Sequence, residues 1–299
     1  MTATTGTSVT ATTGTSVTVR TLPRKRRKRR PAAGILAIVF SLIWFFPIYW
    51  MVNTALKPRS EVMTSTPIFV SWHPTFENFA TAVFQSGFLI NLRNSAIVVT
   101  GAVLFSIVIG VLAAAALTRF RFRGRRTIMV VILAVQMLPA TALLIPTFLV
   151  FNKLNLLGTF GGLILAYVAT TLPFSIWVMR GFFIVIPREV EEAAMIDGAG
   201  TFRILWSILF PLVMPGVIST SVFAFIHAWN DYLVAYTFMK QQSMYTLPVW
   251  LVSFSSPVTG TDFGGQMAAS VLFSLPVVIF FLIIQRRLVS GISAGSVKG

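Results

Sequence analysis

The stretch REVEEAAMIDGAGTFRILWSILFPLVMPG, residues 188–216, interrupts a chain that otherwise consists largely of long apolar segments. It holds three glutamates, one aspartate and two arginines, although the whole chain has only eight acidic residues. Helices often end at a glycine in the left-handed conformation, so Gly198 predicts a corner between two short helices. We expect Pro187 to open the first helix and Thr201 to cap the second, which is strongly apolar.

The composition of the chain is that of a membrane protein. Of its 299 residues, 56% are hydrophobic and 11% are charged, whereas about a quarter of the residues of a soluble protein are charged. The apolar residues form blocks of about 20, the length that crosses a bilayer as a helix. The sequence therefore predicts an all-α polytopic protein with six transmembrane helices, at residues 32–52, 95–117, 127–150, 160–178, 213–236 and 266–284.

The first 30 residues differ from the rest and form a separate predicted segment. The sequence ATTGTSVT occurs at residues 3–10 and again at 11–18, and RKRRKRR follows at Arg24–Arg30. Such a small, polar repeat predicts disorder because it buries little apolar surface. Basic runs also occur in nucleic-acid-binding proteins, but a run directly before a span is typical of a topology signal. We predict a disordered basic cytoplasmic tail at 1–30 and a transmembrane domain at 31–299, and no nucleic-acid partner.

The distribution of basic residues predicts the orientation in the membrane. If the N-terminus is cytoplasmic, 19 of the 24 lysines and arginines lie in cytoplasmic segments and the other five lie outside. Cytoplasmic loops are enriched in basic residues, so both termini are predicted to be cytoplasmic. The same assignment places the charged stretch around Gly198 in the cytoplasm, where anionic lipid would repel its carboxylates. Docking on a partner protein is therefore the better interpretation of this loop.

The residue inventory gives little support to an enzyme. The chain has no cysteine and only two histidines, far apart in sequence, so no metal site is predicted. It also lacks the G-x-x-x-x-G-K-[ST] motif that cradles nucleotide phosphates. We therefore expect no catalytic residue and no cofactor in this chain.

The charged stretch resembles the EAA motif of ABC importer permeases. Glu192-Ala193-Ala194 is followed after three residues by Gly198, and after nine more by Ile208, with Phe210-Pro211 where the family usually has Leu-Pro. The resemblance extends over about residues 35–299 and is closest to the second, smaller permease of maltose- and trehalose-type sugar importers, a type I fold. The further segments that carry it are NTALKP (53–58), NSAIV (94–98), AWNDYL (228–233), TLPVWL (246–251) and QRRLVSGISAGSVKG (285–299).

The resemblance implies a complex in the plasma membrane of a bacterium. In this family two permeases form the translocation path, two ATPase subunits bind ATP and Mg²⁺, and an extracytoplasmic solute-binding protein delivers the substrate. The loop at about 187–211 would be the coupling helix that docks on the ATPase. The residues carried over to that role are Glu192, Ala193, Ala194, Asp197 and Gly198.

Two further sets of residues are candidates for function. Polar groups inside a span are costly and often functional, which makes Gln136, Asn230 and Asp231, with Trp229, candidates for the translocation path. An interfacial aromatic belt and helix–helix hydrogen bonds would explain the same residues. The resemblance also implies that the C-terminal tail, with Ser293, Gly295 and Lys298, contacts the ATPase, although a solvated chain end would have the same composition.

The sequence leaves two alternative functions open. One is a permease for another solute, such as glycerol phosphate or a polyamine. The other is a membrane scaffold that does not transport and uses the acidic loop for docking. No basic cluster lies within a predicted span of this chain, which disfavours an anion site in this subunit.

Overall fold

In the computed structural model of the chain, the described residues are 31–85, 87–252, 254–256 and 260–295. They belong to two compact units, divided between Pro47 and Ile48. The boundary falls within helix α1 (Pro31–Ala55), whose part from Gly34 onward has a mean hydropathy of 2.3 and is long enough to cross a membrane. The predicted tail at 1–30 lies outside the described residues.

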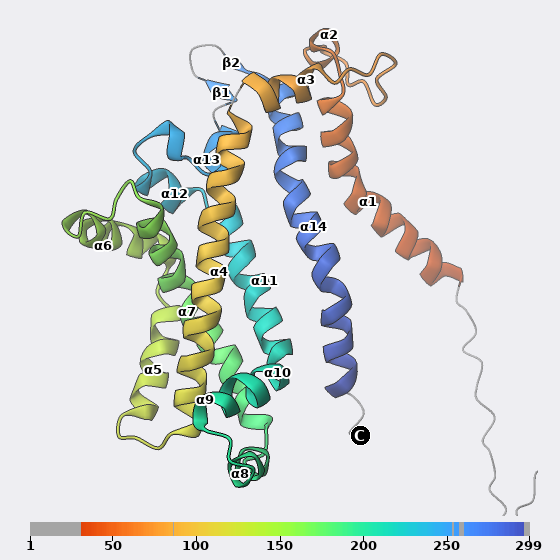
Figure 1. Cartoon of the computed structure of the whole chain (residues 1–299). Coiled ribbons are helices and arrows are strands. Elements are labelled where there is room, and N and C mark those ends of the chain that lie inside the picture. Colours follow the sequence, from red (N-terminus) through yellow and green to blue (C-terminus); the bar gives the residue numbers. More distant parts are fainter. Residues whose placement is uncertain (1–30, 86, 253, 257–259, 296–299) are drawn as a thin grey trace, which may run out of the picture. The chain divides into compact units, whose positions relative to one another are not determined.

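The second unit is built on long apolar helices that lie side by side (Figure 1). Helices α4 (Phe88–Arg119) and α7 (Phe160–Val185) pack along each other, and α11 (Met214–Asn230) packs against both. Helix α14 (Phe263–Gly295) lies beside α11. Apart from two strands of two residues each, the regular structure of the described chain is helical, which confirms the predicted all-α fold.

Small and hydroxyl-bearing residues bring α4 and α7 close together. A Cβ atom on Gly110 would lie only 3.3 Å from the Cβ of Ser175. One turn away, the hydroxyls of Ser106 and Thr171 share a hydrogen bond of 2.8 Å. In membranes, where apolar surface gains little from leaving lipid, close backbone approach and hydrogen bonds drive such packing.

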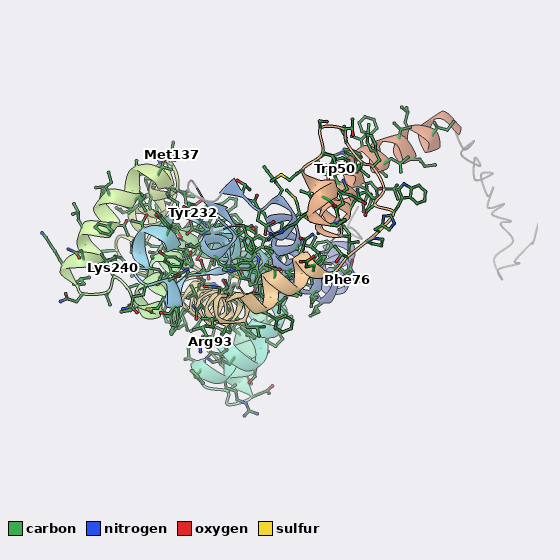
Figure 2. All side chains as sticks on the ribbon, turned by 90° about the horizontal axis from the view of Figure 1, so that it is seen from above. Trp50, Phe76, Arg93, Met137, Tyr232 and Lys240 are labelled. Atoms are coloured by element: carbon green, nitrogen blue, oxygen red, sulfur yellow. The ribbon has the colours of Figure 1, made fainter. Side chains whose placement is uncertain are left out.

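The third predicted span, residues 127–150, is wrong as a continuous helix. Helix α5 (Arg125–Gln136) and helix α6 (Ala140–Lys153) meet at an angle of 106°. The break lies before Pro139, which has no N–H and disfavours the helical conformation of the residue before it. Met137, at the break, is 85% exposed and lies at the edge of the molecule in Figure 2.

The fifth predicted span, residues 213–236, is wrong at its C-terminal end. Helix α11 stops at Asn230, and the chain turns at Asp231 into the short helix α12 (Leu233–Phe238). Before α11, the segment Thr201–Leu212 meets it at an angle of 75°. This segment consists of the helical turns α9 (Thr201–Arg203), η2 (Ile204–Leu209), a π-helix, and α10 (Phe210–Leu212).

Among the described residues, four helices are long and apolar enough to cross a membrane, and the number is six if each bent pair forms one span. The chain is thus a multi-pass membrane protein. The predicted end of the last span, residue 284, is not the end of its helix, because α14 continues to Gly295. Hydropathy marks the limit of the apolar part of a helix, and polar residues extend the helix beyond it.

The remaining elements lie at the end of the bundle opposite α8 (Glu189–Ile196) in Figure 1. We call this the far end. Its elements are α2 (Arg59–Val62), α3 (Glu77–Ala80), η1 (Thr81–Gln85), η3 (Gln242–Met244), α13 (Leu247–Val252), β1 (Ser255–Ser256) and β2 (Gly260–Thr261), with the two strands antiparallel.

Candidate functional site

Helix α8 and the turn after it, residues 189–200, form a closed corner at one end of the bundle, which we call the α8 corner. Gly198 has φ +80°, as the predicted left-handed residue requires. Its N–H donates to Met195 O at 3.0 Å, and the N–H of Ala199 donates to Ala194 O at 2.9 Å. This is the Schellman motif, which satisfies the last carbonyls of a helix and reverses the chain. The predicted glycine corner is confirmed.

The two predicted helix starts near this corner are each displaced by a residue or two. Arg188, not Pro187, precedes the first residue of α8. Gly200, in an extended conformation with ψ 161°, is the N-cap of α9, so Thr201 is the first helical residue and not the cap. A Thr N-cap is only a preference, and the glycine before it adopts the extended cap conformation without strain.

An ion pair attaches the α8 corner to the end of α4. Arg119 Nε lies 2.6 Å from Glu191 Oε1, and both side chains are only 13% exposed. A second nitrogen of Arg119 donates to Ile186 O at 3.2 Å. Neither residue was identified from the sequence. Three glutamates occur within four positions, and only the rotation of α8 against α4 decides which of them meets an arginine.

The corner has a buried side and an exposed side. Ala194 is 8% exposed and packs in one cluster with Ile204 and Leu209 of the following η2 and with α7 residues such as Met179 and Phe183. Of the five residues assigned to docking, Ala194 is therefore in the core. The other four, Glu192, Ala193, Asp197 and Gly198, are exposed.

Apolar side chains accompany the exposed carboxylates. Ile196 is 86% exposed, Phe202 is 76% exposed and Met195 is 57% exposed. A small pocket of about 260 Å³ lies between the end of α4, α8 and η2, with Met195 and Leu205 in its wall beside the Arg119–Glu191 pair. An acidic, partly apolar surface with a pocket beside it suits a protein partner better than anionic lipid.

The candidate path residues Trp229, Asn230 and Asp231 lie at the end of α11. Asp231 Oδ2 accepts from Tyr167 Oη at 2.9 Å and from the N–H of Ala235 at 3.0 Å. The carboxylate thus links the end of α11 to α7 and accepts from the first turn of α12, at the point where the chain leaves α11 in an extended conformation. Trp229 is 3% exposed and stacks on Phe273, with ring centroids 5.8 Å apart.

The two amide side chains among the candidate path residues, Asn230 and Gln136, are more exposed than Trp229. Asn230 is exposed and donates to Ile226 O, one turn back, at 3.0 Å. Gln136 is also exposed and is the last residue of α5, next to the break between α5 and α6. Within the described part of the chain, no hydrogen bond joins Gln136 to the Trp229–Asp231 segment. Of the tail residues, Ser293 and Gly295 lie in the last turns of α14, and Lys298 lies outside the described residues.

The comparisons with known proteins all match components of transport systems. The family described as "binding-protein-dependent transport system inner membrane component" matches residues 106–294, which include the α8 corner. The chain is 39% identical over 266 residues to the diacetylchitobiose uptake system permease protein DasC of Streptomyces coelicolor, and the match covers 89% of this chain and 96% of that protein.

Two further matches extend over nearly the same part of the chain. It is 34% identical over 265 residues to the trehalose/maltose transport system permease protein MalG of Thermococcus litoralis, covering 88% of this chain and 95% of that one. A chain in the crystal structure of a bacterial ABC transporter involved in the import of the polysaccharide alginate has the same fold, with a TM-score of 0.77 and 24% identity. That match covers 89% of this chain and 98% of the other.

Proposed function

The chain belongs to the family of binding-protein-dependent transport system inner membrane components, and from that premise we propose that it is one permease of an ATP-driven importer of di- or oligosaccharides. The predicted resemblance to ABC importer permeases is confirmed, and the chain is a transporter subunit, not an enzyme. The family also contradicts the alternative of a scaffold that does not transport. The substrate class rests on the relatives, which are permeases of a diacetylchitobiose uptake system and of a trehalose/maltose transport system.

The observation that carries the proposed mechanism is the α8 corner. It is fixed to α4 by the Arg119–Glu191 pair, yet it exposes Glu192, Asp197 and Ile196. A surface that is linked to α4 on one side and exposed on the other can pass the movement of a partner on to that helix. We infer that an ATPase subunit, which binds ATP and Mg²⁺, docks here, so that its closure displaces α8 and with it the ends of α4 and α7.

The complex would contain a second permease, two ATPase subunits and an extracytoplasmic solute-binding protein, in a bacterial plasma membrane with both termini of this chain cytoplasmic. The proposed orientation is supported by the distribution of basic residues. The ATPase can only shift the transporter between inward-open and outward-open states by binding them with different affinity. Contacts of the α8 corner with the ATPase would supply that difference, and Ser293, Gly295 and Lys298 of the C-terminal segment would add to them.

Glu192→Lys tests the docking surface, because it reverses a charge on an exposed position that makes no ion pair within the described residues. We expect the variant to insert and fold normally but to lose the ATPase on co-purification and to lose sugar uptake. Arg123→Glu, an equally large charge reversal on an exposed residue outside the corner, is the control. If Glu192→Lys retains both the ATPase and uptake, the corner is not the docking site.

The substrate is tested by uptake in cells that express the complete importer. Labelled disaccharides, glycerol phosphate and a polyamine are compared, and only the disaccharides should accumulate and compete with one another.

The translocation path is tested separately. Asn230→Cys in this cysteine-free chain should react with a membrane-impermeant thiol reagent in at least one nucleotide state. A cysteine there that stays unlabelled in every state would assign Asn230 to packing.

A further inference from the structure

A second pocket lies at the same end of the bundle as the α8 corner. It has a volume of about 880 Å³ and opens between the α4–α5 loop, the first turns of α5 and the part of α7 near Trp177. It shares no lining residue with the smaller pocket beside α8. Figure 1 shows the α4–α5 loop and α8 at the same end of the helices. Four arginines and no acidic residue line it: Arg121, Arg125, Arg126 and Arg180.

Among the described residues, no carboxylate forms an ion pair with any of these arginines. Within the described residues, the ion pair at this end joins Arg119 to Glu191 and involves none of the four. Arg180 Nε is buried and has no acceptor. A buried donor without an acceptor is unfavourable, and like charges around one space repel each other. An anion with several oxygen acceptors would relieve both effects, and the planar guanidinium group binds phosphate oxygens in pairs.

The rest of the pocket wall is apolar and exposed. Val130 is 65% exposed, Leu133 is 42% exposed and Trp177 is 50% exposed. Val130 and Leu133 belong to the apolar part of α5, and tryptophan is enriched where a span meets the headgroup layer. The wall therefore changes from apolar to cationic over a short distance, in the order in which an acyl chain and a phosphate headgroup follow each other in a bilayer.

We propose that this pocket binds the headgroup of an anionic phospholipid, with the arginines around its phosphate and an acyl chain along α5. The proposal uses the orientation proposed above, which places the pocket at the cytoplasmic leaflet, where anionic lipids attract basic residues. A volume of about 880 Å³ lies within the range of small-molecule sites and exceeds what a single inorganic phosphate needs. The bound lipid would hold the first turns of α5 and the α4–α5 loop at the membrane surface.

The test uses the full chain, co-purified with its partner subunits in detergent, and native mass spectrometry with added phosphatidylglycerol or phosphatidylcholine. The variant is Arg125→Gln combined with Arg180→Gln. The control is Arg123→Gln combined with Arg203→Gln, which removes two exposed charges from the same end but none from the pocket. Each pocket arginine should contribute about fivefold to affinity, so the variant should bind phosphatidylglycerol about 25-fold more weakly, and the control should bind it like the parent.

Other outcomes would overturn the proposal. Equal weakening in variant and control would mean diffuse attraction rather than a site. Phosphatidylcholine bound as tightly as phosphatidylglycerol would mean an apolar groove without headgroup recognition. Displacement of the lipid by millimolar inorganic phosphate would assign the pocket to a soluble anion, and loss of a partner subunit from the variant alone would assign it to an acidic protein segment. If the double variant does not assemble, Arg180→Lys keeps the charge without the planar group and should still weaken binding severalfold.

None of these outcomes depends on sugar uptake. A failure of the lipid proposal therefore leaves the proposed transport function untouched, and a failure of the transport assays leaves the lipid measurement interpretable.

Discussion

The far end of the bundle and the α8 corner are held in different ways. At the far end, side-chain amides bind the backbone of segments distant in sequence. Asn94, fully buried, donates to Ser243 O at 2.9 Å and to Tyr245 O at 3.0 Å, and Asn78 donates to Ala55 O and Lys57 O at 2.9 and 2.8 Å. At the α8 corner, the polar link between α8 and the helix ends is the Arg119–Glu191 pair.

This difference shows how one chain combines a fixed part and a movable part. Buried amides with two partners each specify one loop geometry, because any displacement leaves several groups without a hydrogen bond. One ion pair and a small apolar core hold α8 with fewer constraints, so the corner can move as a unit when a partner binds it. Two of the segments that carry the resemblance contribute to the far end, since Asn53 and Asn94 both bind loop backbone, Asn53 by donating to Phe69 O at 2.9 Å.

The largest expected effect comes from Arg119→Ala, which removes the link between α4 and α8. Glu191 would then remain largely buried without a partner. Removing one partner of such a buried pair lowers the free energy of unfolding by about 3 kcal/mol. The α8 corner should become sensitive to limited proteolysis and the ATPase should bind more weakly. Protease cleavage of the purified permease measures the first consequence, co-purification of the ATPase measures the second, and the thermal midpoint of the permease measures the loss of stability.

The pair itself is isolated by a double-mutant cycle. Arg119→Ala combined with Glu191→Ala should recover part of the lost stability, since no unpaired carboxylate remains. The exposed Arg123→Ala is the matched control and should resemble the parent. If Arg123→Ala and Arg119→Ala behave alike, the ion pair does not hold the corner.

A smaller effect is expected for Asn94→Ala at the far end. The variant leaves the carbonyls of Ser243 and Tyr245 without their donor. We expect this to lower the free energy of unfolding by about 2 kcal/mol. The thermal midpoint should fall, whereas the ATPase should still co-purify, because the α8 corner is at the other end of the helices. Asn152→Ala, at an exposed position, is the control. Loss of the ATPase in Asn94→Ala would show that the two ends are not independent.

The smallest effect on stability is expected for Gly198→Val. The left-handed conformation disfavours a β-branched residue by about 1–2 kcal/mol, and no described atom lies within 4 Å of a Cβ placed there, so the strain is confined to the backbone. The permease should stay folded, but the displaced corner should lower ATPase binding and uptake. Gly198→Asn is the control, since asparagine tolerates this conformation. Equal damage from both variants would indicate a clash with the partner and not backbone strain.

Local features of the fold were predictable from the sequence. The apolar blocks, the left-handed Gly198 and the EAA spacing depend on residues close together in the chain, and the structure or the comparisons confirm them. The proline that bends α5 against α6 was visible as well, but its effect was not, because membrane helices often accommodate a proline with a small kink.

What only the tertiary structure decided is how distant groups meet. Glu191 and not Glu192 pairs with Arg119, because the rotation of α8 is set by Ala194 packing into the core. Asp231, directly after α11, accepts a hydrogen bond from Tyr167 on another helix. Arg180 joins three arginines that are more than fifty residues away in sequence. Periodicity and composition describe one segment at a time, whereas each of these contacts is fixed by the packing of two.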